Sequence, residues 1–284
     1  MADLQTLSGC VNLVLATLLP PFYVRILYIF CSKPSYRNLE CYRLMIQIGF
    51  LQLTALPSAV TLGVMQLINQ DFWNLATIFG SVFSSAVRIE SVLNVVLALN
   101  RLKIICGLRY PAKIHTALSI LGYVYGLAVF ILIYTPLSGY GAKQGARLAS
   151  WDYSKPWTWL IVTINKYVLI TSYSLTMLIY MAILAYLCWM RMSTRTGFSS
   201  FLKESGILWS SAARFGFDLG QHLAYHLTGI PKGPWLKFWL INAYFLNSLL
   251  VPEPETRVLN DVQAEGEQDA ECECPEPWEE VGSD

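Results

Sequence analysis

Charged side chains are scarce in this 284-residue chain. Asp, Glu, Lys and Arg make up 14% of it, whereas soluble domains carry roughly 25%. Long apolar runs take their place, since 55% of the residues are hydrophobic and the mean hydropathy is +0.44. A soluble globular domain is therefore excluded, and the composition predicts an integral membrane protein.

A disulfide framework is also missing. Seven cysteines are present, an odd number, and their spacing is scattered. We expect reduced thiols in helices and in loops on the cytoplasmic side. Cys272 and Cys274 form a C-x-C motif in acidic surroundings, and two such ligands are too few to indicate a metal site.

Enzyme signatures are absent as well. The sequence has no glycine-rich phosphate loop before a helix and no G-x-S-x-G elbow. His222 and His226 share a helical face at a spacing that suits zinc, but no Glu follows His222 and no third ligand is apparent. We expect no enzymatic activity, no cofactor, no metal and no nucleic-acid partner.

Five apolar segments are long enough to span a bilayer, which needs about 20 residues of helix. They cover residues 8–31, 42–68, 73–100, 116–138 and 158–189. The segment 73–100 carries the most polar groups, and we expect it to be the central helix. Pro20, Pro21 and Pro57 predict kinks, which neighbouring helices in a bundle tolerate.

The basic residues of the loops predict the orientation. Alternate loops, including a basic loop from Arg101 to His115, carry ten Lys and Arg on one side and three on the other. The positive-inside rule then places the ten in the cytoplasm and the amino terminus outside. The first residues lack the features of a cleavable signal peptide, so we expect the first span to be an uncleaved anchor. The predicted location is the plasma membrane.

The carboxyl-terminal part is less regular. Residues 193–252 hold no full-length span, and 206–230 is typical of an interfacial amphipathic helix. Residues 235–250 are apolar but short, which favours a short span or an interfacial segment. The tail, 253–284, has twelve acidic residues and one basic residue, and it is expected to be disordered.

Polar residues inside the spans are the candidate ligand-binding residues. They are Arg88, Glu90, Asn94, Asn165 and Lys166. Charges at this depth are costly, so they face protein or a polar cavity. Glu90 and Asn94 share a face, Arg88 points elsewhere, and Glu90 and Lys166 lie at similar depth. Two interpretations stay open and are compatible: an ion pair that holds the bundle together, and the lining of a ligand cavity.

Two short motifs resemble a known family. Cys-Tyr-Arg-Leu-Met at 41–45 opens the second span, and Leu-Ala-Leu-Asn-Arg at 97–101 closes the third. In order, spacing and topology they resemble the nematode serpentine chemoreceptors, most closely class T. The resemblance covers roughly residues 10–192. It implies an all-α, rhodopsin-like seven-helix membrane bundle, a small-molecule ligand, a heterotrimeric G-protein partner and a place on sensory neurons, including the sensory cilium.

The resemblance also implies a role for Asn100 and Arg101. They stand where related receptors carry an acidic residue and an arginine, so Arg101 becomes the switch residue that faces the G protein. The sixth and seventh spans are atypical here, and the usual outer-loop cysteines are missing. Two alternatives therefore stay open: a non-signalling, divergent or truncated receptor-like protein, and a small transporter or channel.

Overall fold

The computed structural model describes residues 2–32, 39–111, 113–142, 149–194, 212–224 and 242–243. Helices dominate these residues, which confirms the predicted all-α bundle. In chain order the elements are α1 (Ala2–Ser32), α3 (Glu40–Leu53), α4 (Ala55–Ile68), the 3-10 turn η1 (Phe72–Asn74), α5 (Leu75–Ile105), α6 (Lys113–Ile133), β1 (Tyr140–Ala142), β2 (Ala149–Trp151) and α7 (Thr158–Thr194). Residues 212–224 form a further helical segment.

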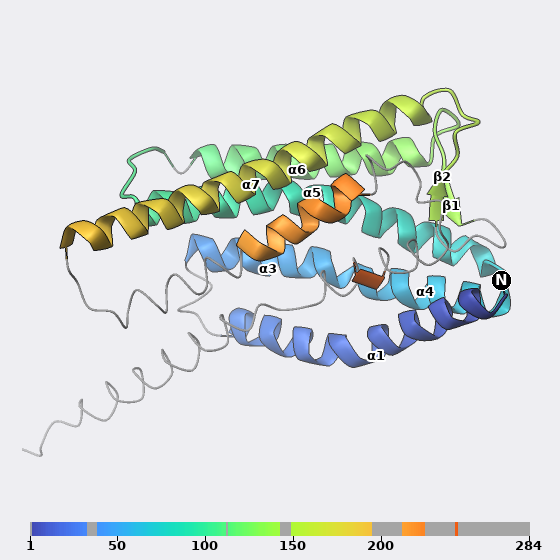
Figure 1. Cartoon of the computed structure of the whole chain (residues 1–284). Helices are drawn as coiled ribbons and strands as arrows, with labels where there is room; N and C mark the ends of the chain where they lie inside the picture. The colour runs from blue at the N-terminus through green and yellow to red at the C-terminus, as the bar shows by residue number, and fades with distance from the viewer. Residues whose placement is uncertain are drawn as a thin grey trace, which may run out of the picture.

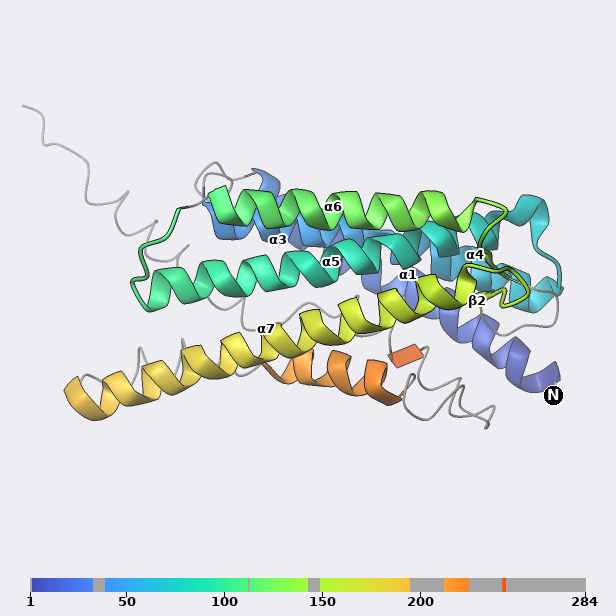
Figure 2. The same cartoon turned by 90° about the horizontal axis from the view of Figure 1, so that it is seen from above.

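The helices run roughly alongside one another, and α5 lies in the middle of them (Figures 1 and 2). Five helical stretches are long and apolar enough to cross a membrane: Gln5–Ser32, Glu40–Ile68, Phe72–Ile105, Lys113–Ile133 and Thr158–Met190. The stretch that contains α5 has the largest buried share of these, which confirms that it is the central helix. One end of the bundle carries the β-hairpin, and we call it the hairpin end. The opposite end, where α5 ends and α6 begins, is the basic end.

The second span is broken at Thr54, three residues before the proline that predicted a break. Pro57 has no N–H to offer to the carbonyl of Leu53, four residues earlier, and its ring crowds that carbonyl. The helix α3 therefore ends at Leu53, and Thr54 turns its own N–H and its hydroxyl back to the Leu51 carbonyl. In α1, by contrast, the helix continues through Pro20 and Pro21.

Asp71 fixes the start of the central helix. Its two carboxylate oxygens accept hydrogen bonds from the backbone N–H groups of Ala76 and Thr77 at 2.9 and 3.2 Å. Those N–H groups have no partner inside the helix, and the positive end of the helix dipole favours a carboxylate there. The turn before α5 is tight, because Asn69, Trp73 and Asn74 all adopt left-handed backbone angles.

The loop after α6 forms a β-hairpin against the start of α5. Strand β1 pairs antiparallel with β2, with Tyr140 opposite Trp151. Gly141 lies close to the Thr77 side chain, so the hairpin covers the hairpin end of α5. At the basic end, α6 begins at Lys113. His115, predicted in a loop, therefore lies in the first turn of α6, where it is buried.

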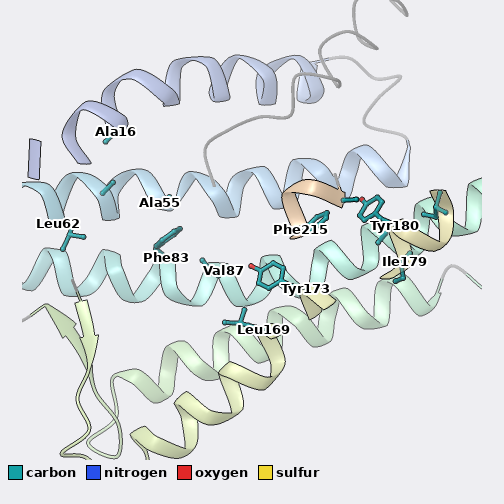
Figure 3. Close-up of a cluster of buried hydrophobic side chains, with 14 of the residues drawn as sticks. Ala16, Ala55, Leu62, Phe83, Val87, Leu169, Tyr173, Ile179, Tyr180 and Phe215 are labelled. Carbon is teal, nitrogen blue, oxygen red and sulfur yellow. The ribbon is translucent and has the colours of Figure 1, made fainter. Parts of the chain in front are cut away.

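The segment 212–224 lies beside α7, drawn in orange in Figures 1 and 2. Phe215 is buried and stacks on the ring of Tyr180, with the centroids 5.4 Å apart. Figure 3 shows both rings in the cluster of apolar side chains that fills the bundle. The prediction of an interfacial helix is thus wrong for these residues, because their apolar face packs on protein.

Three predictions lie outside the described residues. These concern the short span at 235–250, apart from residues 242–243, the acidic tail at 253–284, and His226 of the histidine pair. His222 is described, and its ring centroid lies 4.9 Å from that of Tyr173.

Glycines let α5 and α6 approach closely. A Cβ at Gly126 would lie 2.2 Å from Cγ1 of Ile89, and one at Gly122 would lie 3.1 Å from Cβ of Val92. Small residues four apart are a common way to bring two membrane helices together. The contact between α5 and α6 therefore depends on the absence of these side chains.

Replacing Gly126 by leucine is expected to destabilise the bundle by about 1–3 kcal/mol, the usual cost of overpacking. The measurement is thermal unfolding of the purified protein in detergent micelles. Val124→Leu is the control, because Val124 is on the same helix and 58% exposed. Equal unfolding temperatures for the two variants would show that α5 and α6 do not meet at Gly126.

Candidate functional site

Glu90 is the centre of a buried polar network. Gln52 in α3 donates from Nε2 to Glu90 Oε1 at 2.5 Å, and the Tyr23 hydroxyl in α1 donates to Gln52 Oε1. Arg214, from the segment 212–224, places Nη2 3.9 Å from the same Glu90 oxygen. Buried polar groups need such partners in place of the water they lose. The network thus joins α1, α3, α5 and the segment 212–224 across the bundle.

The ion pair between Glu90 and Lys166, one of the interpretations that the sequence leaves open, is not formed among the described residues. Among the described residues, the cation that faces Glu90 is Arg214. Lys166 is only partly buried and places Nζ 5.9 Å from the ring centroid of Tyr167, an exposed residue. Glu90 and Lys166 lie at similar depth along their helices. Depth does not fix which faces of two helices meet, and α7 turns Lys166 toward the outside of the bundle.

Asn94 belongs to the central network, as its spacing predicted. It lies one turn after Glu90 on α5, close enough to interact with that carboxylate. Asn94 also borders a cavity of about 80 Å³ between α1, α3, α5, α7 and the segment 212–224. The side chains around this cavity that carry polar groups are Tyr23, Gln52, Asn94, Arg101, Tyr180 and Arg214, and the rest are apolar. A space of this size holds several water molecules.

Arg88 turns away from Glu90, as expected for residues two apart on a helix. Its Nη1 donates to the Ser84 hydroxyl at 2.7 Å and to the Ser84 carbonyl. Its Cζ lies 5.7 Å from the ring centroid of Trp151 in β2. Arg88 is 5% exposed. The hairpin therefore covers a buried cation.

Asn165 and Tyr125 complete this second group. The Tyr125 hydroxyl in α6 donates to Asn165 Oδ1 in α7. Arg88 lies close enough to Tyr125 to interact with it. Asn165 is 4% exposed, and its Nδ2 has no hydrogen-bond partner among the described residues. A buried donor without a partner costs about 1–3 kcal/mol. We call Arg88, Tyr125, Asn165 and Trp151 the hairpin-side polar group.

Arg101 lies at the basic end of the cavity. Its Cζ is 5.7 Å from the ring centroid of Tyr180, which itself stacks on Phe215. Tyr180 belongs to α7 and is 1% exposed. The Arg101 guanidinium therefore lies over a buried ring at the contact between α7 and the segment 212–224. The adjacent Asn100 is 2% exposed, and its Oδ1 accepts no hydrogen bond within the described ranges.

Sequence reasoning missed several members of these groups. Gln52 interrupts an apolar run in the second span, and that signal was available. Arg214 lies in a stretch whose mixed composition suggested an interface, and Tyr125 and Tyr180 are ordinary tyrosines within spans. In the part of the chain that the structure describes, no three His, Cys, Asp or Glu side chains cluster as metal ligands.

Comparison with known proteins supports the fold but gives no close relative. No family model matches the sequence, and no curated protein matches it. Among solved structures, the crystal structure of squid rhodopsin matches with a TM-score of 0.60 at 10% identity, over 98% of this chain and 93% of that one. At this identity the likeness concerns the fold alone. The chain therefore has a rhodopsin-like receptor fold, as predicted.

Proposed function

We propose that the chain is a G-protein-coupled chemosensory receptor, most similar to the class T serpentine receptors of nematodes. The observation that carries this proposal is Arg101, which lies over the Tyr180 ring and borders a largely apolar cavity with a few polar side chains, within a rhodopsin-like fold. The Arg101 guanidinium lies over the Tyr180 ring of α7, which stacks on Phe215 of the segment 212–224. A change in the packing of this segment on α7 therefore changes the position in which Arg101 meets a partner protein.

In this proposal the receptor lies in the plasma membrane of a sensory neuron, including its cilium. The amino terminus and the hairpin end face outward, and the basic end faces the cytoplasm, as the excess of Lys and Arg in its loops indicates. Asn100 and Arg101 then lie at the end where a heterotrimeric G protein docks.

The ligand-binding residues in this proposal are Arg88 and Asn165, with Lys166 at the margin. Arg88 supplies a buried cation, and Asn165 supplies a donor that no described residue uses. A small molecule with a hydrogen-bond acceptor satisfies that donor. Because apolar helices surround the two groups, the rest of such a molecule is expected to be apolar.

Glu90 and Asn94 connect the ligand to the switch residue. They lie on α5 between Arg88 and Arg101, and Glu90 faces Arg214 on the segment 212–224. A ligand that favours one packing of the helices shifts the population toward it. We propose that this shift moves the segment 212–224 relative to α5, and with it the Phe215 ring next to Tyr180.

The experiment expresses the full chain in cells with a promiscuous Gα subunit and a calcium reporter. A panel of small organic acids, ketones, alcohols and amines is applied. Asn165→Leu is expected to raise the half-maximal concentration of an active compound about tenfold or more, which corresponds to about 1.4 kcal/mol of lost binding. Ile164→Leu is the control, because Ile164 is 47% exposed on the same helix.

Two outcomes contradict the proposal in different ways. Silence across the panel, with the chain confirmed at the cell surface, argues against a signalling receptor. A response that Asn165→Leu leaves unchanged keeps the receptor but removes Asn165 from the ligand site.

A further inference from the structure

The cavity between α1, α3, α5, α7 and the segment 212–224 has a wall rich in positive charge. Arg101 of α5 and Arg214 of the segment 212–224 both line it, and none of the described residues around it is acidic. The ligand-binding residues proposed above, Arg88, Asn165 and Lys166, do not line it. The charge of the wall therefore favours an anionic occupant that the proposed receptor function does not use.

The nearest described carboxylate leaves room for a second acceptor. Glu90 Oε1 accepts a hydrogen bond from Gln52 at 2.5 Å and lies 3.9 Å from Arg214 Nη2. An N–H···O hydrogen bond measures roughly 2.7–3.2 Å, so the contact with Arg214 is an ion pair without a hydrogen bond. A guanidinium presents several N–H donors in a planar fork. Arg214 can therefore serve Glu90 and a ligand at the same time.

Arg101 brings a second fork to the same space. Its Cζ lies 5.7 Å from the ring centroid of Tyr180, which stacks on Phe215, and both rings, labelled in Figure 3, line the cavity. Arg101 is half-buried, and the side chain of Arg214 is 21% exposed. A small solute can therefore reach both guanidinium groups.

The rest of the wall and the size of the cavity restrict the occupant further. Apolar side chains from α1 and α3 face the space, among them Ile26, Leu27, Phe30, Met45 and Ile48. They suit an alkyl group better than a fully hydrated inorganic ion. The volume of about 80 Å³ is only several times what one water molecule needs. A short alkyl chain fits, and a long one does not.

We propose that this cavity binds a short-chain carboxylate, such as propionate, between Arg101 and Arg214. The two oxygens of a carboxylate match the planar fork of a guanidinium, which a spherical halide ion does not. The alkyl group then lies among the apolar side chains of α1 and α3. Because Arg101 belongs to α5 and Arg214 to the segment 212–224, the bound anion bridges these two elements and stabilises their contact.

The direct test is equilibrium dialysis of radiolabelled propionate against the full chain in phosphatidylcholine nanodiscs. We expect saturable binding above that of empty nanodiscs, and an unfolding temperature that rises with the propionate concentration. The absence of both would overturn the proposal. The assay contains no G protein, so its result does not depend on whether the chain signals.

Unlabelled competitors define the chemistry of the occupant. Acetate and butyrate are expected to displace propionate, whereas propionamide, which has the same shape but no charge, is not. Equal displacement by propionamide would overturn the role of the guanidinium groups. Equal displacement by chloride would overturn the preference for a carboxylate, and equal displacement by octanoate would place the binding at the lipid surface.

Substitutions locate the binding. Arg214→Gln is expected to weaken propionate binding about tenfold or more, the loss of a charge-assisted hydrogen bond. Arg25→Gln is the matched control, because Arg25 is exposed on α1 and does not line the cavity. Equal losses in the two variants would place the site elsewhere.

A second variant covers the case in which Arg214→Gln does not fold. Arg214→Lys keeps a positive charge opposite Glu90 but lacks the planar fork. We expect this variant to fold and to bind propionate more weakly than the wild type. Unchanged affinity in Arg214→Lys would overturn the proposed contact between the carboxylate and the guanidinium of Arg214.

Discussion

Replacing Arg101 by alanine is expected to abolish G-protein activation while the protein still reaches the cell surface. The guanidinium lies 5.7 Å from the Tyr180 centroid, and it lines the cavity together with Arg214. A partly desolvated cation over an aromatic ring is worth about 0.5–2 kcal/mol, which is too little to unfold a bundle with this much packing. In the proposed function the same group faces the G protein, so the loss is expected in signalling. The measurement is calcium release beside surface labelling.

Two further variants define what Arg101 contributes. Arg101→Lys keeps the charge but loses the planar group that stacks on Tyr180, and it is expected to retain a reduced response. Arg109→Ala removes a positive charge from the exposed loop after α5 and should signal normally. Normal signalling by Arg101→Ala would remove the switch role and leave an ordinary positive-inside arginine.

Replacing Glu90 by glutamine is expected to cost about 3 kcal/mol of stability. This is the lower end of the range for breaking a buried ion pair, because the two atoms are 3.9 Å apart and Arg214 is 21% exposed. The change leaves the Arg214 charge without the carboxylate it faces. Thermal unfolding and the yield of monodisperse protein in detergent measure the effect.

The double variant Glu90→Gln with Arg214→Met should be milder than the sum of the two single changes, because it buries no charge without its partner. Glu90→Gln with Lys166→Met is the matched control. Lys166 has no ion pair with Glu90 among the described residues, so these two effects should add. Additivity for Arg214 as well would show that Glu90 and Arg214 do not interact.

The helical bundle was predictable from the sequence because few backbone structures satisfy their hydrogen bonds inside a membrane. An apolar run of span length satisfies its backbone hydrogen bonds within a helix, so its secondary structure follows from its composition. The break in the second span was also predictable in principle. Its position at Thr54 follows from the carbonyl that Pro57 leaves without a donor, four residues earlier.

The partners of the polar residues were harder to predict. Glu90 and Asn94 share a helix, so their spacing was enough. Arg214 is more than a hundred residues from Glu90, and its segment is too polar to stand out as a span. The rotation of α7 about its own axis decides whether Lys166 faces Glu90. This rotation cannot be predicted from the amino-acid composition of the helix. The same limit applies to His115, whose partners come from two other parts of the chain.

The tight turn between α4 and α5 has a consequence for how the protein is made. Asn69, Gln70 and Asp71 alone separate α4 from η1, so we expect α4 and α5 to leave the translocation channel as one hairpin. Within α5, Arg88 and Glu90 oppose entry into lipid, and each charge costs about 2.5–3.5 kcal/mol on insertion scales. The helix α4 has no charged residue. We therefore expect α4 to enter beside α5 and to offset that cost before α7 and the segment 212–224 have been synthesised.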